Sequence, residues 1–144
     1  MAKQVMPKKV MPNQVMPHQA SLVLAADDSP SLAAFYGTLL GCQPQAGFSA
    51  SHWRLAWPGG GLLEIYQPSQ ARPLSRQIGR LSLCLQRDRT DAQPLAQLQA
   101  WIDSTLAAGA TLEQPPRLEP FGAEAWLRDP EGNRFLLLIR CPGQ

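Results

Sequence analysis

The stretch DPEGNRFLLLIR, residues 129–140, decides the fold more than any other part of the sequence. Asp, Pro, Gly and Asn are the residues that tight turns require, so residues 129–133 predict a turn. The apolar run 135–139 that follows has the length of a buried strand. Before the turn, residues 123–128 alternate in a strand pattern, with Ala123, Ala125 and Leu127 on one face. The two segments therefore predict a closing β-hairpin.

Outward from this hairpin, one order of elements, strand–helix–strand–strand–strand, occurs twice along the chain. In the first half the predicted strands are 22–26, 47–49, 52–57 and 62–66, and the helix runs from Asp28 or Ser29 to Gly41. In the second half the predicted strands are 80–86, 111–113, 123–128 and 134–139, and the helix runs from Pro94 to Gly109. The class is therefore α+β, with two βαβββ modules (about 20–67 and 79–140) forming a partly open barrel that bears a cleft.

Two motifs resemble those of the vicinal oxygen chelate superfamily, the glyoxalase / bleomycin-resistance / dioxygenase fold. The first is Ala34–Cys42, in which an aromatic pair precedes a leucine-glycine helix end, and the second is Gly122 followed by 129–135. The resemblance covers nearly all of residues 20–144 and implies the fold. It leaves the activity open, because this fold hosts lyases, epimerases, dioxygenases, transferases and plain binding proteins.

Superfamily members with metal chemistry place four inward ligands, usually His, Gln or Glu, on the first and last strands of both modules. The resemblance puts these positions at Ser21, Glu64, Arg80 and Leu136. Only Glu64 can ligate well, because arginine stays protonated and leucine has no donor atom. The sequence therefore predicts a degraded metal site and no metal cofactor.

Arg80 suggests what replaces the metal. It can form an ion pair with Glu64 in a partly buried cleft, or it can hold a carboxylate, phosphate or enolate-like oxygen of a ligand through its bidentate fork. The two roles are compatible, since a ligand anion can compete with Glu64 for the guanidinium.

Strand alternation assigns further side chains to the cleft. The predicted ligand-binding set is Ser21, Trp53, Glu64, Tyr66, Arg80, Cys84, Glu124 and Trp126. Tyr66 and Trp126 can stack a planar ligand or simply fill a barrel core. The inward face of residues 52–57, and with it the direction of Trp53, stays open. Cys84 is expected to be an inert thiol, and His52 a surface residue rather than a base.

Composition narrows the class of protein. The 144 residues suit one domain, and no apolar run approaches the roughly 18 residues of a membrane span. After residue 16 the chain has ten arginines against eleven acids, so the domain lacks the basic character of nucleic-acid binding. Three widely spaced cysteines and no signal-like start predict reduced thiols in a cytoplasmic protein.

Residues 1–19 differ from the rest. They contain the pentads QVMPK, KVMPN and QVMPH, and proline at every fifth position interrupts regular structure. We expect a flexible tail, or a docking element for a partner or a second subunit.

The sequence thus predicts a metal-free protein that binds a small molecule, with Arg80 on an anionic or oxygen-rich ligand. Whether it is an enzyme stays open. One alternative is a metal-dependent lyase or isomerase of the glyoxalase I type, and another is a non-enzymatic partner-binding subunit that uses the tail. A homodimer is compatible with the sequence; nucleic acid and membrane partners are not expected.

Overall fold

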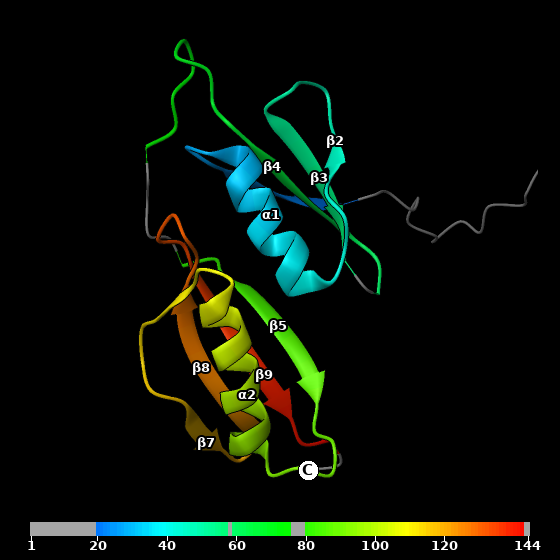
Figure 1. Ribbon diagram of the computed structural model, residues 1–144, viewed down its shortest axis with the longest axis vertical. Coiled ribbons are helices and arrows are strands. Elements are labelled where there is room, and N and C mark those ends of the chain that lie inside the picture. Colours follow the sequence, from blue (N-terminus) through cyan, green and yellow to red (C-terminus); the bar gives the residue numbers. More distant parts are fainter. Residues whose placement is uncertain (1–19, 58, 76–79, 143–144) are drawn as a thin grey trace, which may run out of the picture.

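Two similar modules follow one another along the chain, stacked along the long axis of the molecule (Figure 1). The structure, a computed structural model, describes residues 20–57, 59–75 and 80–142. The tail prediction for residues 1–19 therefore lies outside the described residues.

The first module contains one helix and a four-stranded sheet. Its elements are β1 (Ser21–Ala25), α1 (Ser29–Leu40), β2 (Gln45–Ala46), β3 (His52–Ala56) and β4 (Leu62–Tyr66). The strand order is β1-β4-β3-β2, in which β1 pairs with β4 in parallel and the other pairs are antiparallel.

The second module repeats this plan with one extra strand. Its elements are β5 (Leu83–Asp88), α2 (Pro94–Ala107), β6 (Thr111–Leu112), β7 (Arg117–Glu119), β8 (Gly122–Arg128) and β9 (Arg134–Arg140). The order is β5-β9-β8-β6, and β7 pairs with β8. The predicted α+β class and the duplicated plan are confirmed, with two sheets that do not close into a barrel.

Local sequence chemistry sets the ends of α1. Asp28 caps its first turn, because the Asp28 carboxylate accepts hydrogen bonds from the Ser31 amide at 3.3 Å and the Ser31 hydroxyl at 2.8 Å. Pro30 lies in the first turn, where its missing N–H costs nothing. Gly41 ends the helix at φ 70°, a left-handed conformation that favours glycine.

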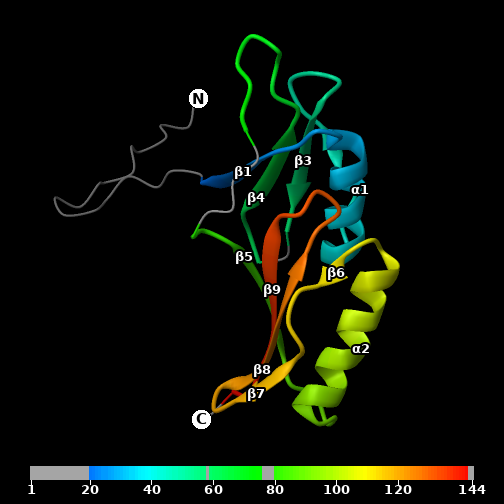
Figure 2. The ribbon, with the colours of Figure 1, turned by 90° about the vertical axis from the view of Figure 1, so that its left-hand side faces the viewer.

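Each helix covers one face of its sheet, and both helices lie on the same side of the molecule (Figure 2). Alternate strand residues pack against the helices and are buried. These include Leu55, Leu63 and Ile65 in the first module and Ala123, Ala125, Leu127, Phe135, Leu137 and Ile139 in the second. The predicted helix-facing side of 123–128 is thus confirmed. The opposite side of each sheet is called its open face below.

The turn 129–133 joins the modules. The buried Tyr36 hydroxyl donates a hydrogen bond to Asp129 Oδ2 at 2.7 Å, and both Phe35 and Tyr36 pack edge-on against Phe135. The Glu131 carboxylate accepts hydrogen bonds from the backbone amides before α1. The two motifs that carry the superfamily resemblance therefore contact each other across the module boundary.

Two predicted strands were misplaced, and one strand was not predicted. The strand predicted at 80–86 begins at Leu83, and the strand predicted at 47–49 lies at Gln45–Ala46. Residues 47–51 instead form a turn, in which the Gly47 amide donates to the His52 carbonyl at 2.7 Å. The strand Arg117–Glu119 was not predicted, because Pro115 and Pro116 precede it.

Candidate functional site

Four polar side chains meet on the open face of the first sheet. The Glu64 carboxylate accepts from the Ser21 hydroxyl at 2.6 Å and from Arg54 Nε at 3.2 Å. His52 Nε2 lies 3.2 Å from the same carboxylate. The structure brings the predicted Ser21 and Glu64 together and adds two residues that the predicted ligand-binding set left out.

The contacts of His52 fix which ring nitrogen carries the proton. Nδ1 accepts a hydrogen bond from the Phe48 amide at 2.8 Å, so Nδ1 has no proton in this arrangement. Nε2 then carries the proton and lies 3.2 Å from Glu64 Oε1. The Phe48 ring stacks on the imidazole at 5.3 Å between centroids. His52 therefore orients Glu64 and is not placed as a free base.

Glu64 is held in its charged form. The hydrogen bond from Ser21 lowers the pKa of Glu64 most, and Arg54 and His52 lower it further against the opposing effect of desolvation. A carboxylate with a lowered pKa is a weak base, and two lone-pair sites of Glu64 already accept hydrogen bonds.

Ladder register places the superfamily's four inward positions. In the first module Val23 lies opposite Glu64, and Ser21 is two residues earlier on the same strand. In the second module Cys84 lies opposite Leu136, and the residue two positions earlier is Ser82. The position predicted for Arg80 is therefore occupied by Ser82, and the register prediction was wrong by two residues.

These residues do not fit a chelated divalent ion. Serine hydroxyls are weak ligands, Leu136 has no donor atom, and Glu64 already accepts two hydrogen bonds and contacts His52 Nε2. In the part of the chain that the structure describes, no three His, Cys, Asp or Glu side chains gather closely enough to hold a metal. No chemical step through a metal follows from this geometry.

Arg80 lies outside the strand that was expected to position it. It is exposed, three residues before β5, and the partners of Glu64 among the described residues are Ser21, His52 and Arg54. The predicted ion pair with Glu64 is therefore made by Arg54 instead. Arg80 was predicted to point inward because side chains alternate along a strand. That alternation does not apply at Arg80, because the regular strand begins only at Leu83.

Trp53 faces α1, not the open face. Residues of β3 and β4 pair so that Trp53 lies opposite the buried Ile65, whereas Arg54 lies opposite Glu64. The inclusion of Trp53 among the ligand-binding residues is thus corrected, because its indole packs against the core. The hairpin register that identifies Arg54 was not fixed by the sequence, because the turn between β3 and β4 can have more than one length.

The predicted Tyr66 lies on the open face of the first sheet, opposite His52. On the second sheet, Cys84, Glu124, Trp126 and Leu136 share the open face, as strand alternation predicted. Glu124 accepts a hydrogen bond from Arg117 Nη2 at 2.6 Å. Desolvation, with help from the Glu124 carboxylate, raises the pKa of the Cys84 thiol, so Cys84 is a poor nucleophile.

Trp126 has a cationic neighbour that the sequence did not identify. The Arg134 guanidinium lies 4.5 Å from the centroid of the indole ring, a cation–π contact. Arg134 Nε and Arg128 Nε both contact Glu113 Oε2, at 2.9 and 3.2 Å. Two guanidinium groups share one carboxylate, so this cluster keeps one net positive charge.

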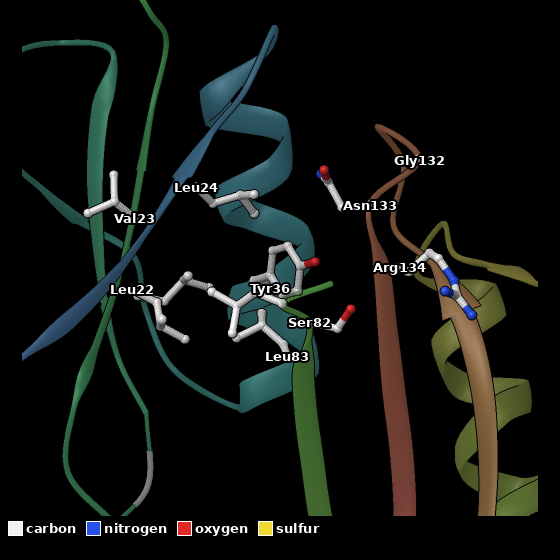
Figure 3. A pocket seen from close by; sticks show the side chains of 11 residues that line it. Leu22, Val23, Leu24, Tyr36, Ser82, Leu83, Gly132, Asn133 and Arg134 are labelled. Atoms are coloured by element: carbon white, nitrogen blue, oxygen red, sulfur yellow. The ribbon is translucent and has the colours of Figure 1, made fainter. Parts of the chain in front are cut away.

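A cleft of about 450 Å³ lies at the seam between the two modules. This seam cleft is lined by Leu22, Val23, Leu24, Tyr36, Leu63, Leu81, Ser82, Leu83, Gly132, Asn133 and Arg134. Figure 3 shows Leu22 and Leu24 on the side of β1, with Ser82, Asn133 and Arg134 on the side of the second module. Arg134 is the one charged residue among those that line it. No member of the predicted ligand-binding set lines the seam cleft.

The expectation of unpaired cysteines is supported. All three cysteines, Cys42, Cys84 and Cys141, are free thiols. None of the helices in the described ranges is long and apolar enough to cross a membrane.

Comparison with known proteins agrees with this geometry. Residues 21–138 match the family model described as a glyoxalase-like domain. No curated protein matches the chain. A glyoxalase/bleomycin resistance protein/dioxygenase family enzyme from Burkholderia phytofirmans PsJN is similar in structure, with a TM-score of 0.69, 21% identity, and 83% of this chain and 96% of that chain covered.

A glyoxalase/bleomycin resistance protein from Albidiferax ferrireducens T118 is 27% identical, with a TM-score of 0.62 and the same coverage of 83% and 96%. Hypothetical protein SA1046 from S. aureus is 16% identical, with a TM-score of 0.69 and coverage of 88% and 96%. The chain belongs to the glyoxalase-like domain family of the vicinal oxygen chelate superfamily.

Proposed function

We propose that this protein binds a small molecule in the seam cleft without a catalytic metal. The observation that carries the proposal is the state of Glu64, whose carboxylate accepts hydrogen bonds from Ser21 and Arg54 and lies 3.2 Å from His52 Nε2. The one good ligand at the superfamily's four positions is thereby committed to protein donors. The adjoining seam cleft has a volume in the range of small-molecule sites.

The lining of the seam cleft favours a ligand with an apolar body and one anionic group. Five of its eleven lining residues are leucines, and desolvation of apolar surface stabilises such a ligand at about 25 cal/mol per Å². Arg134, Ser82 and Asn133 contribute polar groups to the lining, and Figure 3 shows the Arg134 guanidinium directed away from Leu22 and Leu24. Arg134 and Arg128 share the single carboxylate of Glu113, so the Arg134 guanidinium retains attraction for a carboxylate or phosphate of a ligand. We therefore assign to Arg134 the anion-holding role expected of Arg80.

Matched pairs of probes test this assignment. Phenylacetate and phenylacetamide have nearly the same shape and differ in charge, and their affinities can be compared by calorimetry. We expect wild type to bind the acid about tenfold more tightly, roughly the effect of one charge-assisted hydrogen bond. Arg134→Gln should abolish that preference. Arg80→Gln, the matched control, should keep it.

The results distinguish which arginine holds the anion, whether the ligand is anionic, and whether the protein binds small molecules at all. Loss of the preference in Arg80→Gln alone would restore Arg80 as the anion-holding residue. Equal binding of both probes would contradict the anionic ligand class but leave apolar binding in place. Failure of a wider panel of aromatic and aliphatic acids and amides to raise the melting temperature would count against small-molecule binding itself.

Elemental analysis addresses the metal-dependent alternative. We expect the purified protein to contain no stoichiometric Ni, Zn, Mn or Fe. Stoichiometric metal that disappears in Glu64→Ala would support a lyase or isomerase of the glyoxalase I type and overturn the proposal.

A further inference from the structure

A second hollow lies beside the seam cleft, along the outer edge of the second sheet. It has a volume of about 660 Å³ and is lined by Leu22, Leu39, Leu40, Trp57, Ser82, Leu83, Cys84, Leu85, Gln86, Arg87 and Trp101. The name edge groove is used for it below. Six consecutive lining residues, Ser82–Arg87, form one long wall, and Leu39 and Leu40 at the C-terminal end of α1 also line the groove.

The long wall of the edge groove is a strand edge that can accept another strand. Among the described residues β5 pairs with β9 alone, so its other side presents backbone N–H and C=O groups with no neighbouring strand. An exposed strand edge of this kind is a template for β-strand addition by an extended peptide. The leucines and tryptophans around it provide apolar pockets for the side chains of that peptide.

We propose that the edge groove binds a Val-Met-Pro repeat of the chain's own N-terminal segment, added as a strand to β5. The repeats have a period of five residues, which span about 16 Å when extended. Ser82–Arg87 covers a similar length, about 16 Å. One repeat therefore fills the edge groove.

The proline of each repeat is compatible with an added strand. In an extended chain, successive residues direct their backbone groups to opposite sides. When Met16 directs its N–H and C=O toward β5, Val15 and Pro17 direct theirs away from the sheet. Proline on an outer edge then removes no hydrogen bond of the ladder. The methionine thioether is also a favourable neighbour for the aromatic wall residues Trp57 and Trp101.

Connectivity places the repeats close to the edge groove. Leu22 of β1 lines it, and the third repeat, residues 14–18, precedes Leu22 by only a few residues. An extended chain from Leu22 to Met16 reaches at most about 20 Å. A short tether of this kind gives an effective concentration in the millimolar range, so a weak contact suffices for occupancy.

The proposal also links the segment to the seam cleft. Leu22, Ser82 and Leu83 line both hollows. A strand seated on β5 would hold these three residues in place and so influence ligand entry. The docking itself does not depend on what the seam cleft binds.

Hydrogen–deuterium exchange on the full-length chain tests the docking. One variant replaces Val and Met in all three repeats by Ser (Val5, Met6, Val10, Met11, Val15 and Met16). The matched control replaces four polar residues of the same segment by Ser (Lys8, Lys9, Asn13 and Gln14). We expect the first variant to speed amide exchange in residues 82–87 by about tenfold or more, and the control to match wild type. Amides of β8 and β9 serve as internal references, because no change is expected there.

Equal exchange of residues 82–87 in all three proteins would overturn the proposal. The source of the added strand is tested by repeating wild type over a roughly hundredfold range of protein concentration. Protection from the same chain is independent of concentration. Protection that grows with concentration would show that a second copy supplies the strand, and would refute docking within one chain.

Discussion

Tyr36→Phe tests whether the contact between the modules stabilises the protein. The substitution keeps the aromatic ring that packs on Phe135 and removes only the hydroxyl that donates to Asp129 at 2.7 Å. Both residues are buried, with Tyr36 1% and Asp129 3% exposed. Burial and the neighbouring Asp129 carboxylate raise the pKa of Tyr36, so the hydroxyl keeps its proton and donates a hydrogen bond.

The expected magnitude follows from the partners of Asp129. Its carboxylate also accepts from the backbone amides of Glu131 and Asn133 and from Asn133 Nδ2, at 2.8 to 3.0 Å. Three of its four hydrogen bonds therefore survive in Tyr36→Phe. A hydrogen bond to a charged group contributes about 1.5–3 kcal/mol, so we expect the free energy of unfolding to fall by about 2 kcal/mol. For a chain of this size that lowers the melting temperature by roughly 6–10 °C.

Urea unfolding at neutral pH measures this change, and Tyr66→Phe is the matched control. Tyr66 lies on the open face, so removal of its hydroxyl should change the free energy of unfolding by less than about 0.5 kcal/mol. Asp129→Ala leaves four donors without an acceptor and should cost about 4 kcal/mol or more. In the Asp129→Ala background, Tyr36→Phe should cost nearly nothing.

Two results would refute this reasoning. The first is a cost for Tyr36→Phe no larger than that of Tyr66→Phe, which would mean that the contact between modules adds no stability. The second is full additivity of Tyr36→Phe and Asp129→Ala, since residues that interact directly must show a coupling energy.

Two further predictions concern acid stability and the closing hairpin. The pKa of Glu64 is lowered in the folded state, so its contribution to stability is complete above the unfolded value of about 4.3 and is lost as pH falls toward the lowered folded value. Urea unfolding between about pH 3 and about pH 7 should show this loss shrinking in Ser21→Ala and vanishing in Glu64→Gln; unchanged acid sensitivity in both variants would contradict the assignment. Gly122→Ala should cost about 3 kcal/mol or more, because φ is 149° and an added Cβ would clash with the Ile139 carbonyl oxygen. Gly132→Ala, with open space around it at φ 88°, should cost only about 1 kcal/mol by thermal unfolding, and equal costs for the two would refute the clash.

The sequence predicted those parts of the fold that local chemistry determines. The cap at Asp28, the stop at Gly41 and the turn 129–133 are each set by residues within a few positions of one another. The same holds for the face that Ala123, Ala125 and Leu127 bury, because alternation fixes it once the strand is known.

The candidate site was predicted less well, because it depends on register and on contacts between distant segments. Arg80 was placed inward on the assumption that a regular strand begins there, but the strand begins at Leu83. Arg54 lies opposite Glu64 because of the register in which β3 pairs with β4. The length of the hairpin turn sets this register, and a shift of one residue would move Arg54 to the other face. The sequence predicted Arg134 only as the first residue of a strand. Its neighbours in the sequence do not indicate that its side chain contacts Trp126 and lines the seam cleft.

The contact between Tyr36 and Asp129 has a consequence for how the chain is made. The two residues are 93 positions apart, and Phe135, which covers Phe35 and Tyr36, belongs to the last strand. During synthesis the N-terminal module emerges from the ribosome first, with these two aromatic rings still uncovered. Truncation before residue 129 would leave the rings permanently exposed, so shortened chains should aggregate or recruit chaperones, whereas the complete chain protects them within the time needed to form its final hairpin.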